Sequence, residues 1–366
     1  MKPFYSPSSP LSKKCLALAL CVSLLGIFLT FFSETNLPYP YKEVQLAAAK
    51  QTALAQEAVL SYVKAEGIPI EPDDLNQTGL IGPEWTELTS SLGLLEAKRT
   101  SLQPDFAALI VKYFHQAGLT KGDTVLCGMS GSFPSLCLAA VCAANQMGLE
   151  IKVIVSYGSS MYGATRLKLS VLRILEIAKN EGILEYTLLA ASPGGDFDQG
   201  NSTLFPNARK DIFALAKEDQ VLMIDEPDIP SSVQRRLALY GDTYDCFLNI
   251  GGASVNVGTS PYTLQFPNGL VTDPPRIPQD SDRGLTYEYA ARNIPVIHLL
   301  SIRDLAEDNG LPYDPVPLTK PGETKVYYTT YHSPWYALGG LFIACFILVM
   351  GKKSSRKKKK LTTFSS

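Results

Sequence analysis

Short apolar runs and segments with helical spacing alternate along the middle of the chain. The apolar runs are rich in β-branched residues, and small residues follow most of them. Strands are expected at residues 124–127, 151–155, 186–190, 221–224, 246–250 and 296–299. Helices are expected at residues 134–147, 165–180, 207–217, 232–239, 286–292 and 302–309. This alternation predicts an α/β fold over residues 121–331, a doubly wound and mostly parallel sheet with helices on both faces.

The residues before this alternation follow a different pattern. Residues 41–66 are rich in Ala, Gln, Lys, Glu and Leu and contain no internal Pro or Gly, which favours one continuous helix. Prolines and glycines in residues 68–100 indicate irregular structure with one short helix around 84–88. Apolar residues at helical spacing predict a further helix at 104–117. Residues 33–120 are therefore predicted to form a stalk or a packing region.

Two longer apolar runs lie outside these segments. Residues 16–32 and 335–350 contain no charged residue and are long enough to cross the hydrocarbon core of a bilayer as helices. The first run ends in Phe31-Phe32 and lacks the small residues of a signal-peptide cleavage site, so an uncleaved anchor is expected. Lysines flank the outer end of each run, so the positive-inside rule predicts a two-pass plasma-membrane protein. Residues 1–15 and the basic residues 351–366 would be cytoplasmic, and the α/β domain extracytoplasmic.

Clusters of glycine and serine follow four of the predicted strands, at residues 128–132, 156–160, 192–196 and 251–254. In a parallel sheet these clusters lie at one edge, which we call the crest, where backbone N–H groups and hydroxyls can bind an anionic group. The residues expected to bind a ligand are Gly128, Gly131, Ser132, Ser156, Gly158, Ser159, Gly194, Gly195, Asp196, Gly251, Gly252 and Ser254. Ser132 is also expected to cap the helix that Pro134 opens. The alternative is that these glycines serve only tight turns.

A serine nucleophile is a second hypothesis for the crest. Ser130 lies in Gly-Met-Ser-Gly-Ser, close to the Gly-x-Ser-x-Gly nucleophile elbow, with Ser132 where the second glycine belongs. His298, at the end of a late strand, is the candidate general base, and the alternative is a core histidine. The candidate orienting acids are Asp196, Asp198, Asp225 and Asp245.

Composition narrows the classes of partner. A net charge of −2 and a pI near 6.0 argue against nucleic-acid binding. The three histidines lack metal-ligand spacing, so we expect no metal. The chain has neither a Walker A motif nor G-x-G-x-x-G, so we expect no cofactor. Four cysteines, interpreted as buried apolar residues or alternatively as disulfide partners, are Cys127, Cys137, Cys142 and Cys246.

Several segments together resemble the bacterial poly-gamma-glutamate system protein family. They include Met-Ser-Gly-Ser-Phe-Pro-Ser-Leu, Ser-Tyr-Gly-Ser-Ser-Met-Tyr-Gly-Ala-Thr, Phe-Leu-Asn-Ile-Gly-Gly-Ala-Ser and Ile-Pro-Val-Ile-His-Leu-Leu, and the likeness spans residues 124–331. The resemblance implies a membrane-anchored accessory protein of poly-γ-glutamate capsule biosynthesis or export. Its partners would be poly-γ-glutamate or a similar polyanion and the membrane subunits of the synthase. The resemblance supplies no catalytic residues, and the alternative is an extracytoplasmic serine hydrolase or transferase that acts on γ-glutamyl chains through Ser130.

Overall fold

The computed structural model describes residues 11–273 and 276–362, with side chains described as far as residue 353. The chain forms two compact units. The first combines Met1–Tyr39 with Tyr328–Ser366, and the second is Pro40–Tyr327.

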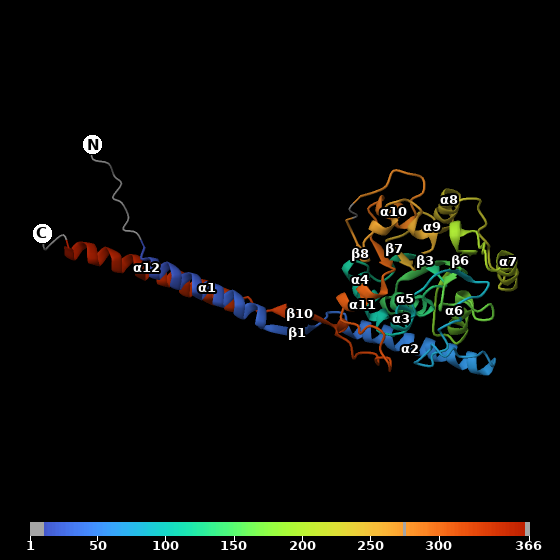
Figure 1. The fold of residues 1–366 in the computed structure, drawn as a ribbon, viewed down its shortest axis with the longest axis horizontal. Coiled ribbons are helices and arrows are strands. Elements are labelled where there is room, and N and C mark those ends of the chain that lie inside the picture. Colours follow the sequence, from blue (N-terminus) through green and yellow to red (C-terminus); the bar gives the residue numbers. More distant parts are fainter. Residues whose placement is uncertain (1–10, 274–275, 363–366) are drawn as a thin grey trace. The chain divides into compact units, whose positions relative to one another are not determined.

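The first unit is a helical hairpin. Helix α1 (Lys13–Phe32) packs against helix α12 (Trp335–Thr362), and strand β1 (Glu34–Pro38) pairs antiparallel with strand β10 (Tyr328–His332) (Figure 1). Both helices are long and apolar enough to cross a membrane. They contain the two apolar runs that the sequence marks as spans.

Two glycines let the helices of the hairpin approach closely. A Cβ atom on Gly26 would lie 2.7 Å from the carbonyl oxygen of Tyr336, and one on Gly340 would lie 3.0 Å from the carbonyl oxygen of Val22. Near them, the backbone N–H of Ala337 donates to Oγ1 of Thr30 over 3.1 Å. Because the helices run antiparallel, the lysines that open α1 and those near the end of α12 lie at the same end of the hairpin.

The second unit is built on a six-stranded sheet with the strand order β6-β4-β3-β7-β9-β8. The strands are β3 (Thr124–Ser130), β4 (Glu150–Ser156), β6 (Thr187–Ser192), β7 (Cys246–Ile250), β8 (Gly269–Val271) and β9 (Val296–Leu299). All neighbours pair parallel except β8 and β9, which pair antiparallel. The predicted α/β class and mostly parallel sheet are therefore confirmed. A separate two-stranded sheet joins β2 (Thr89–Ser91) to β5 (Ser159–Ser160).

Helices cover both faces of the sheet (Figure 1). One layer contains α2 (Lys42–Ala65), α4 (Phe106–Gln116), α5 (Pro134–Met147) and α6 (Val171–Asn180), which pack against one another. The other contains α8 (Ile229–Tyr240), α9 (Ser254–Val257) and α10 (Leu285–Ala290), which enclose an aromatic-rich core over β3, β7 and β9. The remaining helices are α3 (Leu95–Thr100), α7 (Ala208–Glu218) and α11 (Ile302–Asp308), with the 3₁₀ turns η1 (Asp196–Asp198), η2 (Thr263–Gln265) and η3 (Lys325–Tyr327).

Several predicted elements differ in the structure. Residues 221–224 form only an isolated bridge between Met223 and Ala191, and residues 84–88 form turns before β2. The helix predicted from residue 165 begins at Val171, because the side chain of Ser170 accepts a hydrogen bond from the backbone N–H of Arg173 and caps it there. Helix α2 packs on α4, α5 and α6 inside the second unit.

Candidate functional site

The four Gly/Ser clusters meet at the crest because the strands that precede them are neighbours in the sheet. Strands β6, β4, β3 and β7 lie side by side and parallel, so their carboxyl ends share one edge. A cavity of about 740 Å³ opens there, between this edge and the segments that carry α3 and α11. The sequence-predicted residues that line the cavity are Ser130, Ser132, Gly158, Gly195, Asp196, Gly252 and Ser254.

The other predicted ligand-binding residues are not among those that line the cavity. A Cβ atom on Gly128 would lie 2.5 Å from the side-chain nitrogen of Asn256, and one on Gly251 would lie 2.2 Å from Oγ of Ser130. The backbone N–H of Gly131 donates to the carbonyls of Ser156 and Gly158. The remaining contacts are Ser156 Oγ to Ser192 Oγ, Ser159 Oγ to the Ser160 carbonyl, and the Gly194 N–H to Asp198. Backbone approach and hydrogen bonding explain these residue types without a ligand.

Ser130 and His298 have separate partners. Oγ of Ser130 donates to the carbonyl of Ile250 over 3.2 Å and accepts the N–H of Ser132 over 3.4 Å. Nδ1 of His298 is 2.9 Å from Nδ2 of Asn249, and its ring meets the edge of Phe266. Burial lowers the pKa of His298 to about 4, which keeps the ring neutral at pH 7.

The hydrogen bonds of the described residues do not join Ser130 to His298, nor His298 to any of the four candidate acids. Asp198 pairs with Arg236, and Asp225 pairs with Arg209. Asp245 accepts the N–H of Thr124, and Asp196 lines the cavity. The proposed Ser130–His298 chemistry stays a prediction, and this hydrogen-bond pattern does not support it.

The N-cap position of α5 is occupied by Phe133 and not by Ser132. Phe133 is the N-cap of this helix, and no side chain accepts a capping hydrogen bond. Oγ of Ser132 instead accepts the backbone N–H of Ser160 over 3.1 Å. The prediction that Ser132 caps the helix is therefore wrong, because its hydroxyl is used to tie the end of β3 to β5.

Lys98 is a cavity residue that the sequence did not indicate. It lies on the short helix α3, and only 2% of its surface is exposed. Its Nζ is hydrogen-bonded to the carbonyl of Ser132, lies 2.5 Å from Oγ of Ser160 and lies 4.1 Å from the centre of the Phe133 ring. Burial lowers the pKa of this amine from its ordinary value of 10.5 to about 7. In the sequence, Leu-Glu-Ala-Lys-Arg-Thr has the composition of an ordinary surface helix.

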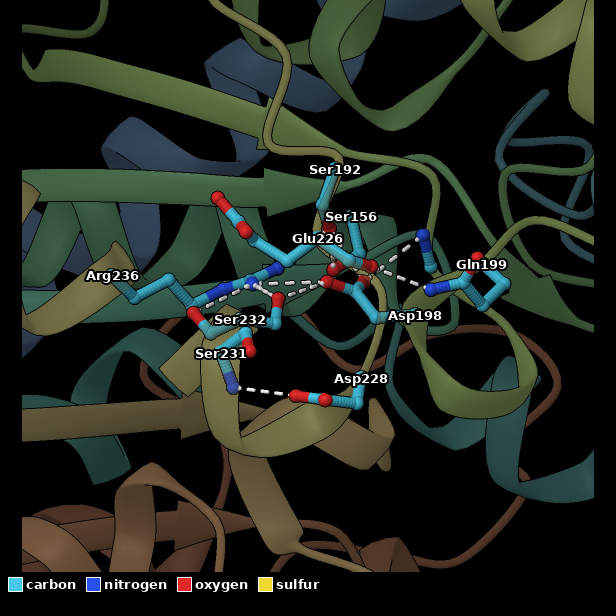
Figure 2. A network of polar contacts seen from close by, with 10 residues as sticks. Ser156, Ser192, Asp198, Gln199, Glu226, Asp228, Ser231, Ser232 and Arg236 are labelled. Atoms are coloured by element: carbon cyan, nitrogen blue, oxygen red, sulfur yellow. Dashed lines mark hydrogen bonds and ion pairs between the residues drawn. The ribbon is translucent and has the colours of Figure 1, made fainter. Parts of the chain in front are cut away.

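A buried ion pair lies at the centre of a polar network around the loop that follows β6 (Figure 2). Asp198 and Arg236 are 2.9 Å apart, with 3% and 1% of their side chains exposed. Asp198 also accepts hydrogen bonds from the hydroxyls of Ser192 and Ser232 and from the N–H of Gly194. These contacts hold the loop after β6, which carries the cavity residues Gly195 and Asp196.

Comparisons with protein-family profiles, curated proteins and solved structures gave no match. The site is therefore interpreted from its own chemistry. Three carboxylates and two basic side chains line the cavity, namely Glu96, Asp196 and Asp304, and Lys98 and Arg303. Over residues 11–273 and 276–362, no three His, Cys, Asp or Glu side chains gather as metal ligands would.

The four cysteines of the α/β domain are free thiols and are buried. Burial raises the pKa of Cys127, Cys137, Cys142 and Cys246, which disfavours the reactive thiolate. They act as small apolar residues of the core.

Proposed function

We propose that this protein is a membrane-anchored accessory protein of poly-γ-glutamate biosynthesis or export, and that the crest cavity binds the polymer or a synthase partner. The observation that carries the proposal is the convergence of the four Gly/Ser clusters on one cavity. Hydroxyls and turns of this kind suit a ligand rich in carboxylate and amide groups. The resemblance of residues 124–331 to the poly-gamma-glutamate system proteins supplies the process.

The charges around the cavity favour a short ligand. A surface that follows a long polyanion would carry many cations, whereas Lys98 and Arg303 face three carboxylates here. The exposed side chains of Leu92 and Leu94 add an apolar rim. We therefore propose that the cavity receives a chain end or a few γ-glutamyl units, or a segment of a partner protein.

The membrane arrangement is part of the same proposal. The lysines of α1 and α12 lie at one end of the hairpin, so the positive-inside rule places that end in the cytoplasm and the α/β unit outside. External protease on intact cells should degrade the middle of the chain and leave tags at both ends protected. Degradation of either terminal tag would contradict this orientation.

The binding proposal is tested by filling the cavity. Ala97 lies on α3 and lines the cavity, so Ala97→Trp places a large ring in it. Lys50→Trp, on an exposed position of α2, is the matched control. We expect Ala97→Trp to reduce polymer yield and the binding of γ-glutamyl oligomers to the detergent-solubilised full-length protein at least tenfold, with protein level unchanged. Normal yield and binding in a folded Ala97→Trp protein would refute the role of the cavity.

A further inference from the structure

A buried lysine without a carboxylate partner lies beside a serine in the crest cavity. Among the described residues, no carboxylate forms an ion pair with Lys98. Its nearest polar partners are the Ser132 carbonyl and, at 2.5 Å, Oγ of Ser160. Burying an unpaired ammonium is unfavourable, so this arrangement favours the neutral amine.

A neutral amine can make all three contacts of Nζ. One N–H donates to the Ser132 carbonyl, and another can point at the face of the Phe133 ring, whose centre is 4.1 Å away. Nζ is placed to donate to Oγ of Ser160 over 2.5 Å; in the neutral amine the lone pair can take this position and accept the hydroxyl hydrogen of Ser160. In this arrangement the lysine is the acceptor and the serine is the donor, as general-base activation of a hydroxyl requires.

The backbone of Ser160 is fixed from several directions. Strand β5 pairs with β2, the N–H of Ser160 donates to Oγ of Ser132, and its carbonyl accepts Oγ of Ser159 over 2.7 Å. Ser160 and Lys98 both line the cavity, so a ligand there can reach the hydroxyl. The pair is thus rigidly held and open to a substrate, which are the conditions that nucleophilic catalysis requires.

We propose that Ser160 and Lys98 form a catalytic pair that cleaves an amide or ester substrate by acyl transfer. This inference goes beyond the proposed binding function and does not depend on the polymer. The substrate class is an acyl compound whose carbonyl carbon can reach Oγ of Ser160 within the crest cavity.

The steps balance with water as the only co-reactant. Oγ of Ser160 attacks the carbonyl carbon while its proton passes to the neutral amine of Lys98. The carbon–nitrogen or carbon–oxygen bond then breaks, and the ammonium of Lys98 returns that proton to the leaving amine or alcohol. The resulting ester on Ser160 is attacked by water, which gives one proton to Lys98. Lys98 passes that proton to Oγ as the carboxylic acid leaves, and both groups regain their starting states.

Lys98 must be deprotonated for this chemistry, so the reaction should become faster as pH rises through the pKa of its amine, about 7. The charged and titratable groups around it are Glu96 and Arg99 on α3, and Asp196, Arg303, Asp304 and Tyr313 on the other walls of the cavity.

The experiment uses the detergent-solubilised full-length protein and a fluorophosphonate probe, with peptide mapping of the labelled residue by mass spectrometry. We expect the label on Ser160, a labelling rate that rises with a midpoint near pH 7, and loss of labelling in Ser160→Ala. Lys98→Arg and Lys98→Met should lower the rate by about 100-fold or more, because neither side chain can accept the proton. Ser61→Ala and Lys64→Met, exposed substitutions on α2, are the matched controls and should label as wild type.

Several results would overturn the proposal. Mapping of the label to Ser130 or Ser132, or an absence of labelling between pH 6 and 9, would do so. Wild-type labelling of a folded Lys98→Met or Lys98→Arg protein would show that the lysine has only a structural role. Thermal unfolding checks the fold of each variant, and Ser160→Ala tests the nucleophile even where a Lys98 variant does not fold. Loss of polymer binding with normal labelling would refute the proposed function and leave this inference standing.

Discussion

Breaking the buried Asp198–Arg236 pair should destabilise the second unit strongly. Asp198→Asn removes the charge of the carboxylate and keeps its size, and asparagine tolerates the positive φ of 63° that Asp198 adopts. The guanidinium of Arg236, 1% exposed, would remain beside neutral hydroxyls of Ser192 and Ser232. Removing one partner of a buried pair generally costs about 3–5 kcal/mol.

The size of this loss in the free energy of unfolding depends mainly on how deeply the ion pair is buried. Arg303 and Glu307 also pair, at 3.8 Å, but 61% and 60% of their side chains are exposed. Water and salt screen such a pair, so Glu307→Gln should change the free energy of unfolding by less than about 0.5 kcal/mol. Glu307→Gln is therefore the matched carboxylate-to-amide control for Asp198→Asn.

Thermal unfolding of the full-length protein can be followed with a thiol-reactive dye. Cys127, Cys137, Cys142 and Cys246 are fully buried and react only when the second unit opens. A loss of 3–5 kcal/mol should lower Tm by roughly 5–8 °C in a unit of this size. Arg236→Met should have a similar effect, because it leaves Asp198 buried without its counter-charge.

The double variant Asp198→Asn/Arg236→Met separates charge from packing. It contains no unpaired buried charge, so it should be less destabilised than either single variant. If both single variants unfold within about 1 kcal/mol of the wild type, like Glu307→Gln, the argument from desolvation is refuted.

Three further predictions concern single groups. Lys98→Met should raise the free energy of unfolding by roughly 1–3 kcal/mol at pH 7. The amine has a pKa of about 7 in the fold and 10.5 in the unfolded chain, so the stability of the wild type should rise as pH increases from 7 to 10.5. The stability of Lys98→Met should not change in this way. A lower Tm for Lys98→Met in thermal unfolding would contradict the burial argument. His298 has a pKa of about 4 in the fold and 6.5 in the unfolded chain, so the unfolded state binds a proton first as pH falls. The wild type should therefore lose stability between pH 6.5 and 4, and His298→Gln should lose less in denaturant titrations. Equal losses in the two proteins would contradict the lowered pKa of His298. Gly351→Cys should form a disulfide with Cys15 on oxidation of isolated membranes, since its Cβ would lie 3.0 Å from Sγ; Gly26→Val should reduce this cross-link on non-reducing gels, whereas Gly339→Val, with open space around its Cβ, should not.

The Gly/Ser clusters show how much of the site was predictable. Each cluster follows a strand and precedes a turn, and this local order can be recognised from a few neighbouring residues. Parallel pairing then requires that Ser130, Ser156 and Ser192 end at one edge. The sequence therefore indicates the crest, but it does not distinguish the residues that face the cavity from glycines that let backbones approach, such as Gly128 and Gly251.

Local patterns also determined the two apolar helices and most elements of the sheet, because periodicity, helix propensity and stop signals act over a few residues. Only the tertiary structure decided the strand order and the antiparallel pairing of β8. It also decided that Asp198 meets Arg236 and that Lys98 is buried beside Ser160. Lys98 and Ser160 are separated by 62 positions, and Ser130 and Ile250 by 120. Contacts over such distances depend on how whole layers pack, and the desolvation that lowers the pKa of Lys98 exists only once those layers enclose it.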